Sequence, residues 1–388
     1  MKRFIFMLLK NPLQIFKLIY YYFVIRNAKR KGIRTIVFNL HHDYFYDILY
    51  PVYKRLKQHK NIRIYFAYLH KKKPLIEYLE KRIEKKLLIS NRISPFINFD
   101  LFICPEITGP DFPVSFLKTK TIEVYHGNGI SAFYEKKDVL NRFDVHFTVG
   151  PKFNEFLDFA YKDKTQKPTI YNVGYPKLDI LLQEYLLTKR LEKEYKTKNK
   201  FTILHAPHWN PFGSLHAFGV AIIEMLASFD VQLLIKPHHY LYAQYPEMDW
   251  KGKLEELENR FDNIVIIKRP NTQEVYPLAD VMISDTGTSA PFEYSLLKRP
   301  LFIFCNEDWF EGEQHAYEER RICETSICFK KLDELKKYIQ QLLTGSPEMK
   351  KLIEEQKKKQ EKLISDLLYN PGTAAERSYQ AVLKELGL

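Results

Sequence analysis

The sequence predicts an α/β protein built from two successive units of alternating strands and helices. From residue 33 onward, short β-branched or apolar runs alternate with longer segments of mixed polarity, which is typical of βα units that form parallel sheets. At 388 residues, the chain exceeds what one hydrophobic core usually accommodates, which favours two domains. No Gly-rich linker separates the halves, so we expect them to face each other across a central cleft.

Each half has its own series of expected elements. In the first half we expect strands at 33–40, 62–68, 101–104, 121–125, 145–149 and 169–173, with helices at 45–58 and 75–87. In the second half we expect strands at 202–206, 232–236, 264–267, 281–284 and 301–304, with helices at 178–193, 214–228, 251–260 and 290–297. The charge-dense stretch 187–200 follows the boundary, which we place between 176 and 177.

The positive net charge of the chain indicates an anionic partner but does not identify which kind. The formal net charge is +13 and aromatic residues make up 15% of the chain, which suits an acidic polymer, a nucleotide or an anionic membrane surface. Residues 1–31 interleave aromatic and aliphatic side chains with eight Lys or Arg residues and are interrupted at Pro12. This predicts either helices lying in a lipid interface or a helix packed on its own domain with a solvated basic face. The uncharged run 18–25 is too short to span a bilayer, and no signal-peptide cleavage site is evident.

The four cysteines are Cys104, Cys305, Cys323 and Cys328, and they show no CxxC spacing. We therefore expect neither a zinc site nor a disulfide framework, and a reducing cytoplasm is the simplest compartment.

The stretch 279–304 predicts a site for a nucleotide diphosphate. A strand ends at Ser284, and after Asp285 come four residues that offer backbone N–H groups or hydroxyls: Thr286, Gly287, Thr288 and Ser289. Pro291 suits the first turn of a helix, whose N-terminus favours anions. Glu293, near the start of that helix, is placed to hold ribose hydroxyls. The alternative is an ordinary turn in a parallel sheet, with Glu293 complementing the helix dipole.

Other candidate residues also follow expected strands, where ligand-binding loops of open α/β sheets lie. His126 precedes Gly127-Asn128-Gly129, an expected turn that lets the backbone approach a ligand closely. His126 is either a general base or a structural hydrogen-bonding residue. Lys236, His238 and His239 end one strand and are suited to neutralising phosphate, unless one histidine caps the strand and the other is solvated.

The loop 205–210 contains two histidines separated by three positions, but Pro207 removes any fixed helix face and no carboxylate is close, so we expect no zinc there. Trp209 either stacks on a base or sugar or anchors packing. A further segment, GYPKLD at 174–179, supplies Tyr175 and Asp179 to the expected cleft.

Five segments taken in order, YHGNG, GYPKLD, APHW, KPH and SDTGTSAPFEYSLLKRP, resemble the CDP-glycerol glycerophosphotransferase family of teichoic-acid and capsule polymerases and primases. The resemblance covers about residues 120–310. It implies a GT-B architecture with two Rossmann-like domains, a donor held mainly by the C-terminal one, and a terminal helix that crosses back. It also implies peripheral attachment to the cytoplasmic face of the membrane, which strengthens the interfacial interpretation of residues 1–31.

The resemblance assigns roles to several positions. His126 matches the proposed base, His238 the histidine near the donor diphosphate, and Glu293 the acid near the ribose. Thr286, Thr288 and Ser289 match the phosphate turn. The sequence departs from the family pattern in three places. The segment between Asp285 and Glu293 is one residue longer, and Gly287 stands where serine is common. His239 follows His238 at a position where tyrosine or proline is frequent. Which hydroxyl contacts phosphate, and whether His238 or His239 acts, therefore stays open.

The expected domains are a membrane-interface segment 1–31, an acceptor-side domain 32–176, a donor-binding domain 177–368 and a crossing helix 369–388. The expected reaction transfers an alditol phosphate from CDP-glycerol, or a related CDP-alditol, to a hydroxyl of a lipid-linked or polymeric acceptor, with no cofactor and no obligatory metal. The rival functions are a GT-B glycosyltransferase or epimerase that uses a UDP-sugar, and a non-catalytic polyanion binder. No RNA- or DNA-binding motif supports the last, and we expect no nucleic-acid partner.

Overall fold

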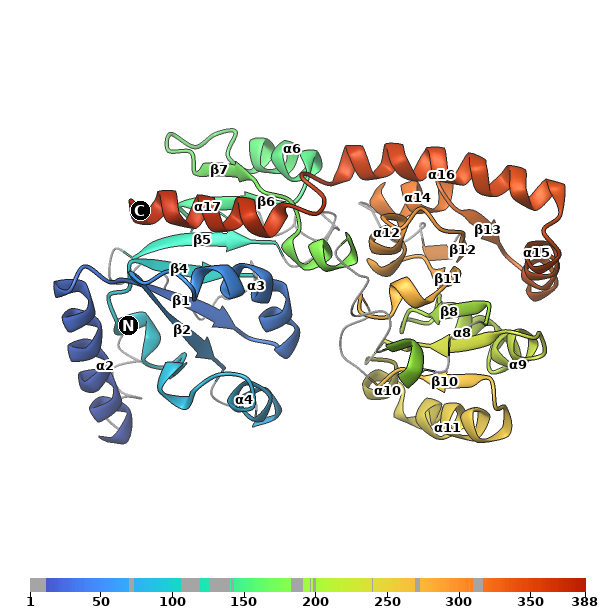
Figure 1. Ribbon diagram of the computed structural model, residues 1–388, viewed down its shortest axis with the longest axis horizontal. Coiled ribbons are helices and arrows are strands. Elements are labelled where there is room, and N and C mark those ends of the chain that lie inside the picture. Colours follow the sequence, from blue (N-terminus) through green and yellow to red (C-terminus); the bar gives the residue numbers. More distant parts are fainter. Residues whose placement is uncertain are drawn as a thin grey trace. The chain divides into compact units, whose positions relative to one another are not determined.

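The computed structural model describes residues 12–69, 73–105, 119–125, 140, 143–182, 191–195, 197, 200–238, 240–268, 273–306, 308–309 and 317–388, and the following account concerns these residues. They form two compact units (Figure 1). Unit 1 contains the described residues from 12 to 125, those from 140 to 179, and 368–388; unit 2 contains those from 180 to 367. The expected domain boundaries were 176/177 and 368/369.

Unit 1 is built on a parallel sheet. Its described strands, in spatial order, are β3 (Leu88–Ser90), β2 (Ile62–Tyr68), β1 (Arg34–Leu40), β4 (Leu101–Cys104), β5 (Lys120–Val124), β6 (Val145–Thr148) and β7 (Thr169–Asn172). Its described α-helices are α2 (Pro12–Arg30), α3 (Asp43–Leu56), α4 (Lys73–Glu80), α6 (Pro151–Ala160) and α17 (Ala374–Leu386). Nearly every residue of β1, β4 and β6 is buried, as expected for strands covered by helices on both faces.

Unit 2 repeats this plan. Its described strands, in spatial order, are β10 (Ile264–Ile266), β9 (Gln232–Ile235), β8 (Thr202–Ala206), β11 (Val281–Asp285), β12 (Leu301–Phe304) and β13 (Ile327–Phe329), all parallel. Its described α-helices are α8 (Ser214–Phe218), α9 (Ala221–Ala227), α10 (Tyr240–Gln244), α11 (Trp250–Arg260), α12 (Ala290–Ser295), α14 (Tyr317–Glu324), α15 (Leu332–Thr344) and α16 (Pro347–Leu367). The two parallel sheets confirm the predicted α/β class.

Some elements differ from the expected ones. The helix expected at 75–87 ends at Glu80, and a short 3₁₀ turn leads into β3, a strand too short for its pattern to be recognised. The helix expected at 214–228 is two helices, α8 and α9, because Gly219 takes a φ of 62° that interrupts the helical backbone.

The C-terminal segment returns to unit 1 through α17, and Asp179 holds its start. The Asp179 carboxylate accepts the backbone N–H groups of Ala374 at 3.2 Å and Ala375 at 2.8 Å, which satisfies donors at the first turn of the helix. Gly174 makes the fit possible, since a Cβ there would overlap the Tyr369 carbonyl oxygen. Burial raises the pKa of Asp179, and the backbone hydrogen bonds from Ala375 and Ala374 oppose that shift.

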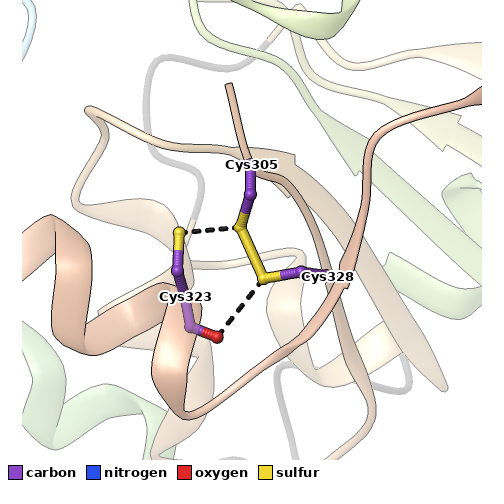
Figure 2. Close-up of side chains that lie close together, drawn as sticks. All are labelled: Cys305, Cys323 and Cys328. Atoms are coloured by element: carbon purple, nitrogen blue, oxygen red, sulfur yellow. Dashed lines mark hydrogen bonds between the residues drawn. A yellow bond between two sulfur atoms is a disulfide. The ribbon is translucent and has the colours of Figure 1, made fainter. Parts of the chain in front are cut away.

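The expectation that the cysteines form no disulfide was wrong. A disulfide joins Cys305 to Cys328, and Cys323 lies against it (Figure 2). Spacing in the sequence did not reveal this, because the three residues are brought together by the neighbouring strands β12 and β13 and by α14. Within the described residues, no helix has the length and apolar character needed to cross a bilayer.

Candidate functional site

The candidate site lies in unit 2, where the strand order reverses between β8 and β11. In open α/β sheets, ligands bind beyond the carboxyl ends of the strands at such a reversal. The backbone N–H of His208 donates to Asp285 Oδ2 at 2.7 Å, and the Ser284 hydroxyl donates to the Ala206 carbonyl at 2.6 Å. The loops that follow β8 and β11 are therefore tied together.

Asp285 is an anchor for the loop after β8. Only 1% of the residue is exposed, and burial raises its pKa to about 6, against hydrogen bonds from Ser214 and from the His208 backbone that lower it. Gly213 lies close by, and a Cβ there would come within 2.9 Å of Oδ2. The carboxylate thus organises residues 208–214 around the end of β11.

An aromatic group surrounds this junction. The ring centroid of His208 lies 5.4 Å from that of Trp209, 6.1 Å from that of His238 and 5.9 Å from that of Trp309. Tyr240 extends the group, with its ring 5.3 Å from His238 and 5.7 Å from Trp209. Trp309 was missed by sequence reasoning, because it follows β12 in a stretch with no recognisable motif. Its ring and that of Trp209 both lie next to His208.

The cationic side of the site comes from the end of β9. Lys236 is half-buried; its N–H donates to the His205 carbonyl at 2.9 Å, and its ammonium reaches the Pro237 carbonyl at 3.4 Å. His238 Nδ1 accepts the Tyr240 N–H at 3.2 Å. In a neutral ring this hydrogen bond places the proton on Nε2, which makes that nitrogen a donor.

The predicted phosphate turn follows β11 directly. Thr286 is buried, and its N–H donates to the Phe304 carbonyl at 3.4 Å, whereas Gly287 and Thr288 are half-buried and Ser289 is exposed. Gly287 takes a φ of 82°, and a Cβ there would come within 2.8 Å of Trp309. Glycine at this position thus lets an indole ring close over the turn, which explains why serine is absent.

Glu293 is buried in α12, the helix that follows the turn. Its Oε2 atom accepts hydrogen bonds from Gln273 at 2.5 Å and from the Tyr276 hydroxyl at 3.0 Å. The same carboxylate therefore holds the segment that precedes β11. Contact between Glu293 and a ribose stays a prediction.

Comparison with known proteins identifies the family. The sequence model of the CDP-glycerol:poly(glycerophosphate) glycerophosphotransferase family matches residues 112–384. The chain belongs to this family. It is thus an enzyme, a glycerophosphotransferase whose family donor is CDP-glycerol. No curated protein sequence matches the chain.

Solved structures agree on the fold of this glycerophosphotransferase. A histidine-to-asparagine variant of the wall teichoic acid polymerase TagF, soaked with CDPG, aligns with a TM-score of 0.66 at 15% identity, covering 97% of this chain and 98% of that one. The UDP-GlcNAc 2-epimerase of Neisseria meningitidis, bound to UDP-GlcNAc, aligns with a TM-score of 0.60 at 13% identity, covering 90% and 100%. The S. aureus MnaA–UDP structure aligns with a TM-score of 0.56 at 12% identity, covering 92% and 98%. The fold is GT-B.

The other predicted residues of the glycerophosphotransferase lie in unit 1, in the loop after β8, or outside the described residues. His126, Gly127, Asn128 and His239 fall outside the described residues, and their roles stay predictions. Pro207 is buried in the loop after β8. Tyr175 and Asp179 are buried in unit 1, where the structure shows Asp179 capping α17. A role for either residue toward an acceptor stays a prediction.

Unit 1 has a second strand reversal, between β1 and β4, which sequence reasoning did not single out. Asn39 lies there, and its amide nitrogen contacts His41 Nε2 at 3.0 Å and Cys104 Sγ at 3.5 Å. Two histidines, His41 and His42, follow β1 directly. Their position after a buried strand was the signal that could have marked them, by the same rule that marked His238.

A buried polar network supports the sheet of unit 1 next to β5. His146 Nδ1 lies 3.2 Å from Glu123 Oε2, His146 Nε2 lies 3.0 Å from the Tyr161 hydroxyl, and that hydroxyl donates to the Leu140 carbonyl at 2.6 Å. Burial lowers the pKa of His146 to about 3 and raises the pKa of Glu123 well above its usual value. Burial thus favours the neutral form of each group, and a neutral Glu123 carboxyl is a hydrogen-bond donor for Nδ1.

Proposed function

We propose that this enzyme transfers glycerol phosphate from CDP-glycerol to a hydroxyl of a lipid-linked or polymeric cell-surface acceptor and releases CMP. The observation that carries the proposal is the bond between the His208 N–H and Asp285, which joins the loops after β8 and β11 at the reversal of the sheet. This junction gathers a hydroxyl-bearing turn, a lysine, a histidine and two indole rings on one edge. Those are the groups that an aromatic nucleotide with a diphosphate requires.

In the proposed complex, the diphosphate lies at the 286–289 turn, with Lys236 and His238 opposing its negative charge. Trp209 and Trp309 provide ring faces for the base or sugar, and Glu293 is the candidate contact for the ribose. Family membership and the placement of Lys236 and His238 at the end of β9 support this arrangement.

The proposed chemistry is an in-line displacement at the phosphorus that bears glycerol. The acceptor oxygen forms a new bond to that phosphorus while the bond to the bridging oxygen breaks, and CMP departs with the bridging oxygen. His126 takes the acceptor hydroxyl proton. Lys236 and His238 stabilise the charge that develops on the leaving group, so that positioning and electrostatics provide most of the rate enhancement.

A donor screen tests the proposed activity. Purified full-length enzyme is incubated with a lipid-linked acceptor and, separately, with CDP-glycerol, CDP-ribitol and several UDP-sugars, and the released nucleotide is quantified. We expect CMP from one or both CDP-alditols and no nucleotide from UDP-sugars. Release of UDP or UMP instead would identify a glycosyltransferase or an epimerase-like activity, and would refute the proposal.

Two histidine variants test the roles within the site. We expect His126→Ala to abolish transfer while CDP-glycerol binding stays nearly intact, and His238→Ala to weaken binding of CDP-glycerol as well. His59→Ala, a change in a turn of unit 1, is the matched control and should leave both unchanged. Turnover of His126→Ala within about tenfold of the wild type would remove its assignment as the base.

We also propose that α2 attaches the enzyme to the cytoplasmic face of an anionic membrane. One face of α2 packs on unit 1 through Tyr21, Ile25 and Ala28. The other exposes Leu13, Phe16, Ile19, Tyr20, Tyr22 and Phe23, with Phe16 70% and Phe23 60% exposed. Exposed lysine and arginine residues lie on the same helix, and exposed apolar surface beside positive charge suits a lipid interface.

Sedimentation with vesicles tests this attachment. The wild type is mixed with vesicles of phosphatidylglycerol and phosphatidylcholine, and with vesicles of phosphatidylcholine alone. We expect binding to the anionic vesicles, and a loss of about 3 kcal/mol or more in a Phe16→Ser/Phe23→Ser variant. Phe159→Ser, which removes a phenylalanine 50% exposed in α6, is the control and should bind like the wild type. Equal binding by the double variant would exclude α2 as the anchor.

A further inference from the structure

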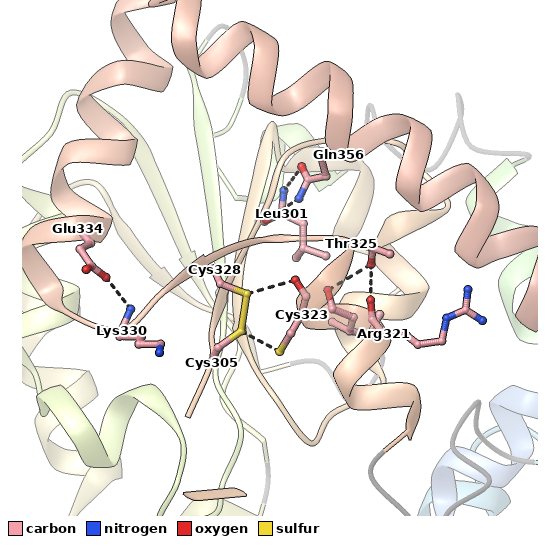
Figure 3. The surroundings of a disulfide bond; sticks show 10 residues. Leu301, Cys305, Arg321, Cys323, Thr325, Cys328, Lys330, Glu334 and Gln356 are labelled. Atoms are coloured by element: carbon pink, nitrogen blue, oxygen red, sulfur yellow. Dashed lines mark hydrogen bonds between the residues drawn. A yellow bond between two sulfur atoms is a disulfide. The ribbon is translucent and has the colours of Figure 1, made fainter. Parts of the chain in front are cut away.

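Three of the four cysteines meet at one edge of unit 2. Cys305 follows β12, Cys328 lies in β13, and Cys323 lies in the last turn of α14 (Figure 3). Their sulfur atoms all lie within 4.8 Å of one another. The Cys323 thiol donates to Cys305 Sγ at 2.8 Å, and Cys328 Sγ lies 3.3 Å from the Cys323 carbonyl oxygen.

The register of two parallel strands creates this group. Ile303 of β12 pairs with Cys328 of β13. Because side chains alternate along a strand, Cys305 points to the same face as Ile303 and so to the same face as Cys328. The Cα atoms of the two cysteines are 5.9 Å apart. The helix α14 precedes β13 and brings Cys323 onto that face.

We propose that Cys305, Cys323 and Cys328, when reduced, form a three-thiolate binding site for a thiophilic divalent cation such as Zn²⁺. This site is separate from phosphoryl transfer, for which we expect no metal. The proposed metal site depends only on the fold of unit 2, and it does not depend on which nucleotide donor the enzyme uses.

The geometry fits such an ion. A tetrahedral Zn²⁺ with Zn–S bonds of about 2.3 Å holds its sulfur ligands about 3.8 Å apart. The three cysteine sulfurs all lie within 4.8 Å of one another, so small side-chain rotations would bring them to this spacing. All three cysteines are half-buried, which leaves a route for the ion and water for the fourth position. Among the described residues, no histidine or carboxylate joins the group.

The electrostatic surroundings favour thiolates that are neutralised by a bound cation over thiolates without one. Cys323 lies at the C-terminal end of α14, where the helix dipole is negative and carbonyl oxygens face outward. Two neighbouring ionic side chains, Arg321 and Glu334, have other partners, as Figure 3 illustrates for Glu334. Arg321 pairs with Asp366 at 2.6 Å, and Glu334 accepts the Lys330 N–H at 2.8 Å. A bound divalent ion would offset the charge of three adjacent thiolates.

The two states are linked by a balanced reaction. A phosphine reductant takes the oxygen of one water molecule, and the Cys305–Cys328 disulfide becomes two thiols. The divalent ion then forms three metal–sulfur bonds as the three thiols lose three protons to the solvent.

Metal content of the full-length protein tests the proposal. The protein is reduced with a phosphine, equilibrated with Zn²⁺ or Cd²⁺, and passed over a desalting column; the bound metal is then counted by mass spectrometry, and the thiolate–Cd²⁺ charge-transfer absorption is recorded. We expect about one ion per chain. Cys305→Ser, Cys323→Ser and Cys328→Ser should each lose it, whereas Cys104→Ser, which changes the remaining cysteine in β4, should retain it.

A second measurement needs no variant. In the reduced wild type, the rate of maleimide modification is followed at each cysteine by peptide mass spectrometry, with and without Zn²⁺. The ion should slow modification of Cys305, Cys323 and Cys328 together and leave Cys104 unchanged. Metal retention by Cys323→Ser, equal retention by a variant lacking all three cysteines, or protection of only two of them would overturn the three-thiolate site.

Discussion

The indole ring of Trp309 lies against the backbone of Gly287, so closely that a Cβ on that glycine would come within 2.8 Å of the ring. Gly287 also takes a left-handed backbone conformation, with φ of 82°. Both features fall in the turn that is the candidate diphosphate site. The turn thus depends on a residue without a side chain, and its shape is coupled to the segment after β12.

Gly287→Ala should therefore weaken CDP-glycerol binding. The methyl group adds about 1 kcal/mol of backbone strain and must also displace Trp309, so we expect affinity to fall by about tenfold or more, measured by calorimetry. Gly219→Ala is the matched control, because Gly219 has a φ of 62° with open space around it. It should lose a similar amount of stability but keep its affinity. Equal affinities of the two variants for CDP-glycerol would mean that the turn does not contribute to donor binding.

Asp285 should make the stability of unit 2 depend on pH. Its pKa is raised from 3.8 to about 6, so the protonated form stabilises the fold below pH 3.8 and this contribution is lost as pH rises through 6. The asparagine of Asp285→Asn can still accept the His208 N–H but does not titrate. We expect the stability of the wild type relative to the variant to fall by about 2–3 kcal/mol between about pH 4 and pH 7, measured by urea unfolding. A constant difference would exclude a raised pKa.

Asp179 should hold the C-terminal helix on unit 1. Asp179→Ala leaves two N–H groups at the start of α17 without their acceptor, which should cost about 1–3 kcal/mol in unfolding experiments. Limited proteolysis should then release a fragment that begins near residue 368. Asp163→Ala changes an exposed aspartate of the same unit and should fall within about 0.5 kcal/mol of the wild type. Similar losses for the two variants would mean that the cap contributes nothing specific.

The Glu123–His146 pair should behave as two neutral groups. The amide of Glu123→Gln can donate to His146 Nδ1 as the protonated acid does, so we expect a loss of about 1 kcal/mol or less. His146→Ala leaves a cavity and an unpaired buried acid, which should cost about 2–5 kcal/mol in urea unfolding. If the pair were ionic, Glu123→Gln would leave a buried charge uncompensated and would cost about 3–5 kcal/mol as well.

The same pair gives a pH dependence with a defined sign. The pKa of His146 is lowered from 6.5 to about 3, so the neutral ring stabilises unit 1 above pH 6.5. That contribution is lost as pH falls from 6.5 toward 3, because the unfolded chain binds a proton that the folded chain excludes. Acid unfolding of the wild type should therefore begin at higher pH than that of a His146→Gln variant. The reverse order would indicate a protonated histidine in the folded state.

Much of the fold was predictable because local patterns sufficed for it. The runs at 62–68, 101–104, 202–206 and 301–304 became strands with those bounds, since strands of buried parallel sheets are short and mostly apolar. β3 and β13, of three residues each, were missed, although the equally short β10 was predicted from the apolar run at 264–267. The break between α8 and α9 was missed because the conformation of Gly219 depends on how the two helices pack.

The sequence by itself determined the class, the family and the positions where chemistry is expected, because strand ends and the residues that follow them are contiguous in the chain. Only the tertiary structure decided which distant residues meet. It placed Trp309 over Gly287 and bonded Asp285 to the loop after β8. It also bonded Asp179 to the first turn of α17, nearly 200 residues further along the chain. It also brought three cysteines together. These contacts arise from the pairing of parallel strands and the docking of helices, and such long-range packing leaves no periodic signal in the sequence.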